Sequence, residues 1–452
     1  GMGFTKLENM YFHLPLDGMR IYPDLVIPAS AMTLVFCLLA GYNACKAVFK
    51  IMPSEAMKPK SPEIGKKILV EHVKIIWRNL DNAWKMIFRN VFRHKRRAFL
   101  TSTGIIFSTA LLLIALSMKD SIDFIIEQQY SNIQDYDIKV NFSIFLNPEE
   151  LSSIKNIPGV VKMEPLLETG VEIQNGWRKK KTSLTAIVKE PEMYRIVNKS
   201  GEIVALPDRG IVLPDKLADQ LEINLNDRVY IKPLLPGKEK IQVPVKGIAK
   251  QYIGMSAFIP LDEVNTIIGE GAIVNSAVLR LKDNSYEEEV KKVLKDMSAV
   301  SSVQSKADSL DALTQNMAAM ASSIGVMIFL SAVLSVAIVY NTATINIFER
   351  QRELATLKVL GFKDNEIKKL VFNENYMITG LGLILGLPFG NWLGQVMMTT
   401  FTTDFYSFPF VTKPLTFLLS IILTIFFTVM ANVILMRKIK SISIVEVLKS
   451  RE

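Results

Sequence analysis

Long apolar windows separated by charged segments dominate the pattern of hydrophobic and polar positions along this chain. Five windows contain no Asp, Glu, Lys or Arg: residues 25–45, 98–118, 312–348, 375–403 and 414–436. They are 21, 21, 37, 29 and 23 residues long, and a helix needs about 20 apolar residues to cross the hydrocarbon core of a bilayer. One such window could be a buried core helix, but five of them predict five transmembrane helices.

Between the second and third windows the pattern changes to short strands and helices. Residues 137–142 alternate as a half-buried strand does, and Asn147-Pro148 is typical of a helix start. Further strands are predicted at 160–171, 182–188, 210–213, 228–231, 241–248, 277–281 and 300–304, with helices at 215–220 and 286–297. The predicted fold class is an α-helical membrane protein with an α+β extracytoplasmic domain, a βαβ-type body interrupted by a β-rich insertion.

Composition changes this picture little, but it excludes several classes of protein. The chain has 452 residues, 49% hydrophobic and 21% charged, and with its five windows it is neither a soluble enzyme nor a disordered chain. Cys37 and Cys45 both fall in or beside the first window and offer no disulfide framework. The three histidines, His13, His72 and His94, lie far apart without ligand spacing, so no metal site is expected.

The distribution of charge orients the predicted helices. Residues 46–97, 349–369 and 437–452 together carry 25 Lys and Arg against 10 Asp and Glu, whereas the rest carries 28 against 34. The positive-inside rule places those three segments in the cytoplasm of a cell whose plasma (cytoplasmic) membrane the chain crosses several times. The expected order is an outer segment 1–24, a helix 25–45, a cytoplasmic linker 46–97, a helix 98–118, an outer domain 119–315, a helix 316–346, a cytoplasmic loop 347–370, a helix 371–398, a short outer loop 399–413, a helix 414–436 and a cytoplasmic tail 437–452.

The overall charge of +9 is concentrated beside the membrane. It therefore favours contact with anionic membrane lipid, and no nucleic-acid partner is expected. Between residues 63 and 99, apolar side chains recur at helical spacing among basic ones, which predicts an amphipathic helix at the cytoplasmic face. These side chains are Ile68, Val73, Ile76, Trp77, Leu80, Trp84, Ile87, Phe88 and Val91.

Two parts of the chain resemble each other. Pro53-Ser54-Glu55-Ala56-Met57-Lys58 after the first window is similar to Ile444-Val445-Glu446-Val447-Leu448-Lys449 after the last, and a proline precedes each window. Repeats in membrane transporters commonly reflect duplicated bundles. We therefore expect residues 1–58 to be the end of a first repeat in a larger permease; a naturally short protein is the alternative. Gly1 before Met2 is typical of a tag remnant or an excised fragment, and no cleavable signal peptide is visible.

The loop at 347–370 carries the most specific pattern. Leu354, Leu357 and Leu360 form an apolar strip, and Gly361 stands where a helix end requires a positive φ. Asp364 is a suitable N-cap for the next helix. The residues expected to form a short projecting helix–turn–helix that presents a ledge to a cytoplasmic partner are Glu349, Arg350, Arg352, Glu353, Leu354, Leu357, Lys358, Leu360 and Gly361.

These residues, with Ile367, Leu370 and Glu374, resemble the coupling region of FtsX-like ABC transporter permeases. Residues 90–105 are similar to the start of that family's first span, and residues 210–229 to the MacB-type periplasmic core domain. The resemblance covers residues 86–450, and the additional leading helix departs from it. It implies that the loop docks on an ABC ATPase subunit, beside a second permease copy or repeat, and that work is done outside by mechanotransmission on peptide, lipoprotein or lipid.

The chain itself lacks the nucleotide-binding motif G-x-x-x-x-G-K-[ST]. It is therefore not expected to be an enzyme or to hold a cofactor, and the resemblance implies that ATP and Mg bind to the partner subunit. Within window 375–403, four glycines recur every four residues and favour close helix packing, inside the bundle or between copies. They are Gly382, Gly386, Gly390 and Gly394.

Two other functions stay open at this point. An FtsX-like regulator could activate a cell-wall hydrolase through an extracytoplasmic protein contact without moving a substrate. A membrane-anchored sensor or receptor could use the outer domain for binding, but it would need a cytoplasmic signalling domain, and the basic segments are short.

Overall fold

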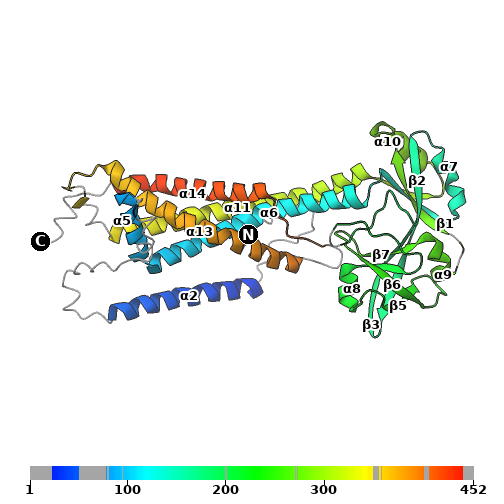
Figure 1. The fold of residues 1–452 in the computed structure, drawn as a ribbon, viewed down its shortest axis with the longest axis horizontal. Helices are drawn as coiled ribbons and strands as arrows, with labels where there is room; N and C mark the ends of the chain where they lie inside the picture. Colours follow the sequence, from blue (N-terminus) through cyan, green and yellow to red (C-terminus); the bar gives the residue numbers. More distant parts are fainter. Residues whose placement is uncertain are drawn as a thin grey trace. The chain divides into compact units, whose positions relative to one another are not determined.

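The computed structural model describes residues 23–49, 78, 81–93, 95–198, 201–269, 271, 273–349, 356–357, 359–401 and 407–440. The chain divides into two compact units, Gly1–Phe99 and Leu100–Glu452. The first contains α2 (Pro23–Phe49), α5 (Asn82–Arg93) and the first residues of α6 (Lys95–Glu127). All other elements belong to the second unit (Figure 1).

Four helices of the described chain are long and apolar enough to cross a membrane, where the sequence predicted five. They comprise Ala98–Ile133, Ile324–Ile345, Asn365–Thr400 and Pro414–Leu435. The remaining predicted span falls in α2, a continuous helix of 27 residues. Its described apolar stretch, Val26–Tyr42, is shorter than the other four. A membrane-spanning role for α2 therefore stays a prediction.

The predicted amphipathic helix is described only in part. In α5 Ile87 and Val91, four residues apart on one face, are buried, whereas Met86 and Arg89 are exposed, so the helix has a buried and an exposed face. Its predicted residues Ile68, Val73, Ile76, Trp77 and Leu80 lie outside the described part of the chain, as do residues 1–22, 50–77 and 441–452.

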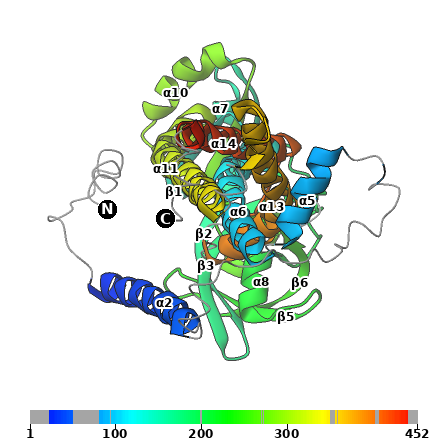
Figure 2. The same ribbon diagram turned by 90° about the vertical axis from the view of Figure 1, so that its left-hand side faces the viewer.

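In the second unit the long helices extend beyond the apolar windows that predicted them. Helix α6 continues to Glu127 and then into a π-helical turn, η2 (Gln128–Ile133), whereas α11 (Lys306–Glu349) begins well before its window. Both lead from the bundle to the α+β domain (Figure 1). α13 (Asp364–Phe401) and α14 (Pro414–Lys440) complete the bundle, and α14 packs along α11 and α13 (Figure 2).

The body of the outer domain is a four-stranded antiparallel sheet in the order β2-β8-β1-β9. Helix α7 connects β1 to β2, α10 connects β8 to β9, and each connected pair of strands is parallel with a third strand between them. This is a split βαβ arrangement of the ferredoxin-like type. The elements are β1 (Ile138–Leu146), η3 (Pro148–Leu151), α7 (Ser152–Lys155), β2 (Val160–Asn175), β8 (Val274–Leu281), η5 (Asn284–Tyr286), α10 (Glu287–Lys295) and β9 (Val300–Ser305).

A closed six-stranded sheet is inserted between β2 and β8. Its strands follow the order β2-β3-β7-β4-β6-β5, and β5 pairs back with β2, so that the second half of the long β2 belongs to this barrel. The predicted body with a β-rich insertion is therefore confirmed, and sequence analysis missed β7. The elements are β3 (Arg178–Ile187), β4 (Ile211–Pro214), α8 (Asp215–Leu221), β5 (Arg228–Pro233), β6 (Ile241–Ala249), β7 (Ser256–Pro260), η4 (Leu261–Glu263) and α9 (Val264–Ile268).

One hydrophobic core runs through both sheets of the outer domain. In β2 the inward-facing side chains Leu167, Val171 and Ile173 are fully buried, and they contact the core of the barrel. Because a strand alternates its side chains between two faces, β2 also presents a solvent-facing row along the barrel. The shared strand and core make the sheet and the barrel one domain.

Candidate functional site

The connection between α11 and α13 holds the predicted coupling residues. Glu349 is the last residue of α11, and Leu357, Leu360 and Gly361 are described. The other coupling residues, Arg350, Arg352, Glu353, Leu354 and Lys358, lie outside the described residues.

The turn at Gly361 has the geometry that the sequence predicted. Gly361 has a φ of 93°, the backbone N–H of Phe362 donates to the carbonyl of Leu357 at 3.0 Å, and that of Leu360 donates to Thr356 at 2.9 Å. This is a glycine-terminated helix end of the Schellman type. It fixes the direction in which the chain leaves the short helix.

The start of α13 has a side-chain cap that sequence analysis did not predict. Asp364 is already the first residue of the helix, and the backbone N–H of Lys363 donates to the Glu366 carboxylate at 2.9 Å. Three residues separate this donor and acceptor, which is the spacing of half a capping box. The Glu366 carboxylate therefore caps the backbone N–H that precedes α13. The side chain of Asp364 lies outside the described part, so its predicted role as a cap stays a prediction.

The apolar strip of the loop divides into an inward and an outward part. Leu357 packs against a buried cluster where α11, α13 and α14 meet, whereas Leu360 is 71% exposed. Val359 and Phe362 are exposed beside it. We call Val359, Leu360 and Phe362 the ledge. The cluster behind the ledge consists of Ala343, Ile347, Ile367, Val371 and Leu435.

The glycine stripe of α13 lies against α6. A β-carbon added at Gly390 would come within 2.8 Å of the Ala110 backbone, and one at Gly382 within 2.5 Å of Ile105. Gly386 faces Thr109 and the backbone of Ile106, and the ring of Phe410 covers Gly394. Small residues allow this backbone approach, so the stripe packs α13 inside the same chain.

The interior of the bundle contains hydroxyl and amide groups that are used for helix packing. On α14, Ser420, Thr424 and Thr428 are buried, and each hydroxyl donates to the carbonyl four residues earlier at 2.8–3.0 Å. At the end near the ledge, Asn375 donates to Asn432 at 2.7 Å. The three hydroxyls of α14 are satisfied by their own helix, whereas Thr109 Oγ1, Ser335 Oγ, Thr344 Oγ1 and Asn432 Nδ2 are buried in the bundle without a hydrogen-bond partner in the described chain.

A short segment before α14, residues 407–413, ties α14 to α6. We call it the outer strap. The Asp120 carboxylate, 8% exposed, accepts from the backbone N–H of Lys413 at 2.9 Å and from the Thr416 hydroxyl at 2.5 Å. Ser121 accepts from the N–H of Val411 at 3.0 Å. A carboxylate at the N-terminus of α14 is also favoured by the helix dipole.

The other end of the outer strap contacts the barrel. The N–H of Ser407 donates to the Tyr252 carbonyl at 2.9 Å, and Lys250 Nζ donates to the Ser407 hydroxyl at 3.1 Å. Lys250 also pairs at 2.9 Å with the buried Asp215, and Tyr252 packs edge-on against Phe124 of α6. Burial, and then the charge of Asp215, raise the pKa of the Tyr252 hydroxyl above its ordinary value. The strap thus connects α14, α6 and the barrel.

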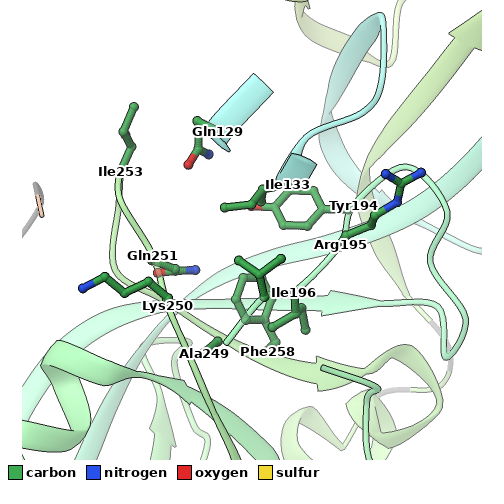
Figure 3. A pocket seen from close by; sticks show the side chains of 11 residues that line it. Gln129, Ile133, Tyr194, Arg195, Ile196, Ala249, Lys250, Gln251, Ile253 and Phe258 are labelled. Atoms are coloured by element: carbon green, nitrogen blue, oxygen red, sulfur yellow. The ribbon is translucent and has the colours of Figure 1, made fainter. Parts of the chain in front are cut away.

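A cavity lies next to this contact, between η2 and the barrel (Figure 3). Its volume of about 10 Å³ leaves room for about one water molecule, which is far too small for a transported molecule. Burial raises the pKa of Tyr194, which lines it, to about 12, so its hydroxyl stays neutral. The lining residues are Gln129, Ile133, Tyr194, Arg195, Ile196, Val197, Ala249, Lys250, Gln251, Ile253 and Phe258. In the described chain no three His, Cys, Asp or Glu side chains gather as metal ligands would.

Comparison with known proteins supports both halves of this architecture. The MacB-like periplasmic core domain matches residues 98–297, and the FtsX-like permease C-terminal domain matches residues 325–444. The chain therefore carries the two domains of FtsX-like, MacB-type ABC transporter permeases. It is therefore a multi-pass membrane protein with an extracytoplasmic domain.

Similar proteins carry the same description. An uncharacterized ABC transporter permease of Methanocaldococcus jannaschii, MJ1507, is 22% identical over 351 residues, which are 70% of this permease and 85% of that protein. The uncharacterized ABC transporter permease protein Rv0987 of Mycobacterium tuberculosis is 20% identical over 45% of this chain, which spans about a quarter (24%) of its length.

Two solved extracytoplasmic domains also align with the permease. One is the extracellular domain of the noncanonic ABC-type transporter YknZ from Gram-positive bacteria. The alignment covers 38% of this chain and 98% of the YknZ domain, with 14% identity and a TM-score of 0.28. The other is the periplasmic region of MacB from Actinobacillus actinomycetemcomitans. The alignment covers 42% of this chain and 98% of the MacB region, with 13% identity and a TM-score of 0.31.

Sequence analysis of the permease missed the outer strap. Asp120 and Lys250 lie in different parts of the sequence from their partners in residues 407–416, without any motif or periodicity. The one available signal was Asp120 itself, which directly follows the charged Lys119 after an apolar window and reads as an ordinary solvated residue. An ABC transporter permease implies an ATPase partner subunit, and the ledge is the described surface beside the predicted coupling residues.

Proposed function

We propose that this permease couples ATP binding and hydrolysis in a separate ATPase subunit to work by its outer domain. The work is export or release of a peptide, lipoprotein or lipid at the outer face by mechanotransmission. The observation that carries the proposal is the ledge: Leu360 is exposed, while Leu357 of the same short helix is packed into the cluster between α11, α13 and α14. A partner that moves the ledge therefore moves three helices together.

The outward half of the route uses the glycine contacts and the outer strap. α13 approaches α6 backbone to backbone at Gly390, and Asp120 holds α14 to α6. Packed interiors transmit displacement because they have little free volume to absorb it. The strap then reaches the barrel at Lys250 and Tyr252.

A path through the described bundle is less well supported than a mechanical route. The buried hydroxyls of α14 donate to their own helix, and the cavity beside η2 holds about 10 Å³. A polar substrate would need groups that can replace its hydration along the way. The substrate is therefore proposed to be handled outside, with its apolar part exposed to membrane lipid or the outer domain.

ATP chemistry is assigned to the partner in this proposal. The sequence contains no G-x-x-x-x-G-K-[ST] motif, whose backbone N–H groups and lysine hold nucleotide phosphates. The permease would then be a non-catalytic subunit, with ATP and Mg bound by the ATPase subunit, and it would act beside a second permease copy or repeat.

The decisive experiment changes the ledge and measures recovery of the ATPase. Leu360→Asp places a charge in the apolar contact, and we expect at least a tenfold loss of ATPase activity copurifying with the tagged permease from membranes. Leu225→Asp is the matched control, because Leu225 is 55% exposed on the outer domain. Equal recovery of ATPase with both variants would overturn the docking role of the ledge.

A regulator that activates a cell-wall hydrolase is the second candidate, favoured by the contact of the outer strap with the barrel, which would carry motion to the outer domain without moving a substrate. Both candidates use the ledge and the strap, and they differ in what the outer domain contacts. Reconstituted vesicles separate them: ATP-dependent release of lipopeptide supports export, whereas hydrolase stimulation without release supports the regulator.

A further inference from the structure

The β2–β3 hairpin projects from the outer domain (Figures 1 and 2). Trp177 lies in its turn, between the paired residues Asn175 and Arg178. Trp177 is 82% exposed. The guanidinium of Arg178 lies 4.6 Å from the centre of its ring and pairs at 2.5 Å with Glu222. Asn175 Nδ2 donates to the carbonyl of Leu221 at 3.0 Å. The tip is therefore anchored at its base while the indole remains in solvent.

Basic side chains continue from the tip along one face of the hairpin. The register pairs Lys179 with Gln174 and Lys181 with Glu172, and paired residues of antiparallel strands share a face. On the other side of β2, Gln174 pairs with Tyr230 and Glu172 with Lys232. Lys240 Nζ lies 4.9 Å from the centre of the Tyr230 ring. We call Trp177, Lys179, Lys181, Tyr230, Lys232 and Lys240 the hairpin face.

This face differs in charge from the domain around it. Residues 134–305 contain 23 Lys and Arg against 24 Asp and Glu, yet Lys179, Lys181, Lys232 and Lys240 gather on the hairpin face around Glu172. Such a local concentration favours an acidic partner through charge complementarity. The two ring–cation pairs also provide flat apolar surfaces beside the charges.

Protection of a strand edge explains only part of the pattern. Lysines on edge strands discourage unwanted pairing, and β3 pairs with β7 only from Ser183 onward. On that side no strand of the described chain pairs with β3 before Ser183, although the Thr182 hydroxyl donates to the Met255 carbonyl. However, β5 is paired on both sides, and its exposed Tyr230 and Lys232 need no such protection. Trp177 protects no edge either.

We propose that the hairpin face binds an acidic polypeptide segment, which adds in extended conformation along residues 178–182 of β3. Side chains two apart in an extended peptide are about 7 Å apart, which is also the separation of Lys179 and Lys181 on their strand. Main-chain hydrogen bonds would hold the segment, and its acidic side chains would meet the lysines. An apolar side chain would stack on Trp177.

The position of Glu172 favours a polypeptide over a uniformly charged polymer. It lies between Lys181 and Lys232 across the three strands, so a polyphosphate would place an anion opposite a carboxylate. A polypeptide can place a neutral residue there and keep its carboxylates at the lysines. This inference does not depend on ATP coupling.

The test uses the full chain in nanodiscs of zwitterionic lipid and a fluorescent 12-residue peptide that alternates Glu with Val and Phe. We expect saturable binding that weakens at least tenfold when every Glu is replaced by Gln. Lys179→Glu with Lys181→Glu should weaken it at least tenfold, and Trp177→Ser about threefold or more. The matched control, Lys292→Glu with Lys295→Glu, changes two exposed lysines of α10 and should leave binding unchanged.

Hydrogen exchange with and without the peptide locates the bound segment. Added protection of amides 178–182 supports strand pairing, and unchanged exchange there overturns it. Equal binding of the Gln peptide, equal loss in the α10 control, or binding of polyphosphate or anionic-lipid vesicles without binding of the acidic peptide would each overturn the proposal. Circular dichroism of the variants confirms that they fold.

Discussion

Replacing Asp120 should loosen the N-terminus of α14 without changing the hydrophobic packing of the bundle. Its carboxylate accepts from the Lys413 N–H and from the Thr416 hydroxyl, and it is 8% exposed. Asp120→Asn keeps one acceptor oxygen and removes the charge, and Asp120→Ala removes both acceptors. The two variants therefore separate the contribution of the charge from that of the hydrogen bonds.

The size of the effect follows from the partners. A hydrogen bond to a charged group contributes about 1.5–3 kcal/mol, and a carboxylate at a helix N-terminus contributes roughly 0.3–1 kcal/mol more. We expect about 1.5 kcal/mol of local destabilisation for Asp120→Asn and about 3 kcal/mol for Asp120→Ala, which leaves a buried N–H without its acceptor. Because 1.4 kcal/mol changes an equilibrium constant about tenfold, amide exchange should rise about tenfold in Asp120→Asn and about a hundredfold in Asp120→Ala.

Hydrogen–deuterium exchange of the peptide that covers residues 407–416, in the full chain, measures this directly. Asp123→Asn is the matched control, since Asp123 is exposed on the same helix and the charge change is the same. Exchange in the Asp120 variants that equals exchange in the control would refute the assignment of Asp120 as the residue that holds the outer strap.

The remaining predictions concern helix packing and pH. Gly390→Ala should destabilise the fold by about 1–3 kcal/mol, because the new β-carbon would lie 2.8 Å from the Ala110 backbone. The measurement is the unfolding temperature in detergent, which should fall. Gly380→Ala is the control, since a β-carbon there meets open space, and equal shifts for both variants would contradict the packing. Asp308 and Ser305 cap α11 reciprocally, and a hydrogen bond from Lys291 lowers the pKa of the Asp308 carboxyl below 3.8. A carboxyl whose pKa is lower in the folded than in the unfolded protein stabilises the fold above the unfolded-state pKa. This stabilisation is lost as the pH falls through the folded-state pKa. Amide exchange at residues 305–308, relative to an unfolded peptide at the same pH, should therefore increase below about pH 4, and an identical increase in Asp308→Asn would contradict this.

Local sequence signals predicted the elements of the fold well where one residue type has one physical use. A glycine after an apolar helical turn predicted the positive φ of Gly361, and the apolar windows located the helices of the bundle. Helix ends were less predictable, because an apolar window indicates the part of a helix that lies in the bilayer, and the helix itself can extend beyond it. α11 begins at Lys306 with a Ser305–Asp308 capping box, ten residues before the predicted span at 316.

The parts of the site that depend on distant contacts could not be predicted. Leu357 and Leu360 have the same character in the sequence, yet one is packed in the bundle and the other is exposed. Only the direction of the short helix relative to α11 and α13 separates them. The strand register that brings Lys232 beside Lys181 across β2 is equally absent from local sequence.

The two kinds of contact on α6 explain why a push at the ledge would reach the outer domain. Side-chain contacts can absorb a displacement by changing rotamers, but the contacts of Gly390 and Gly386 involve backbone atoms of α6, which have no such freedom. At the outer end, Asp120 prevents α14 from sliding along α6 without the loss of two hydrogen bonds. Motion of α13 and α14 must therefore move α6 or break the strap. In the proposed coupling, the first alternative would carry force into η2 and the barrel, so the strap variants and the glycine variants should impair it by different routes.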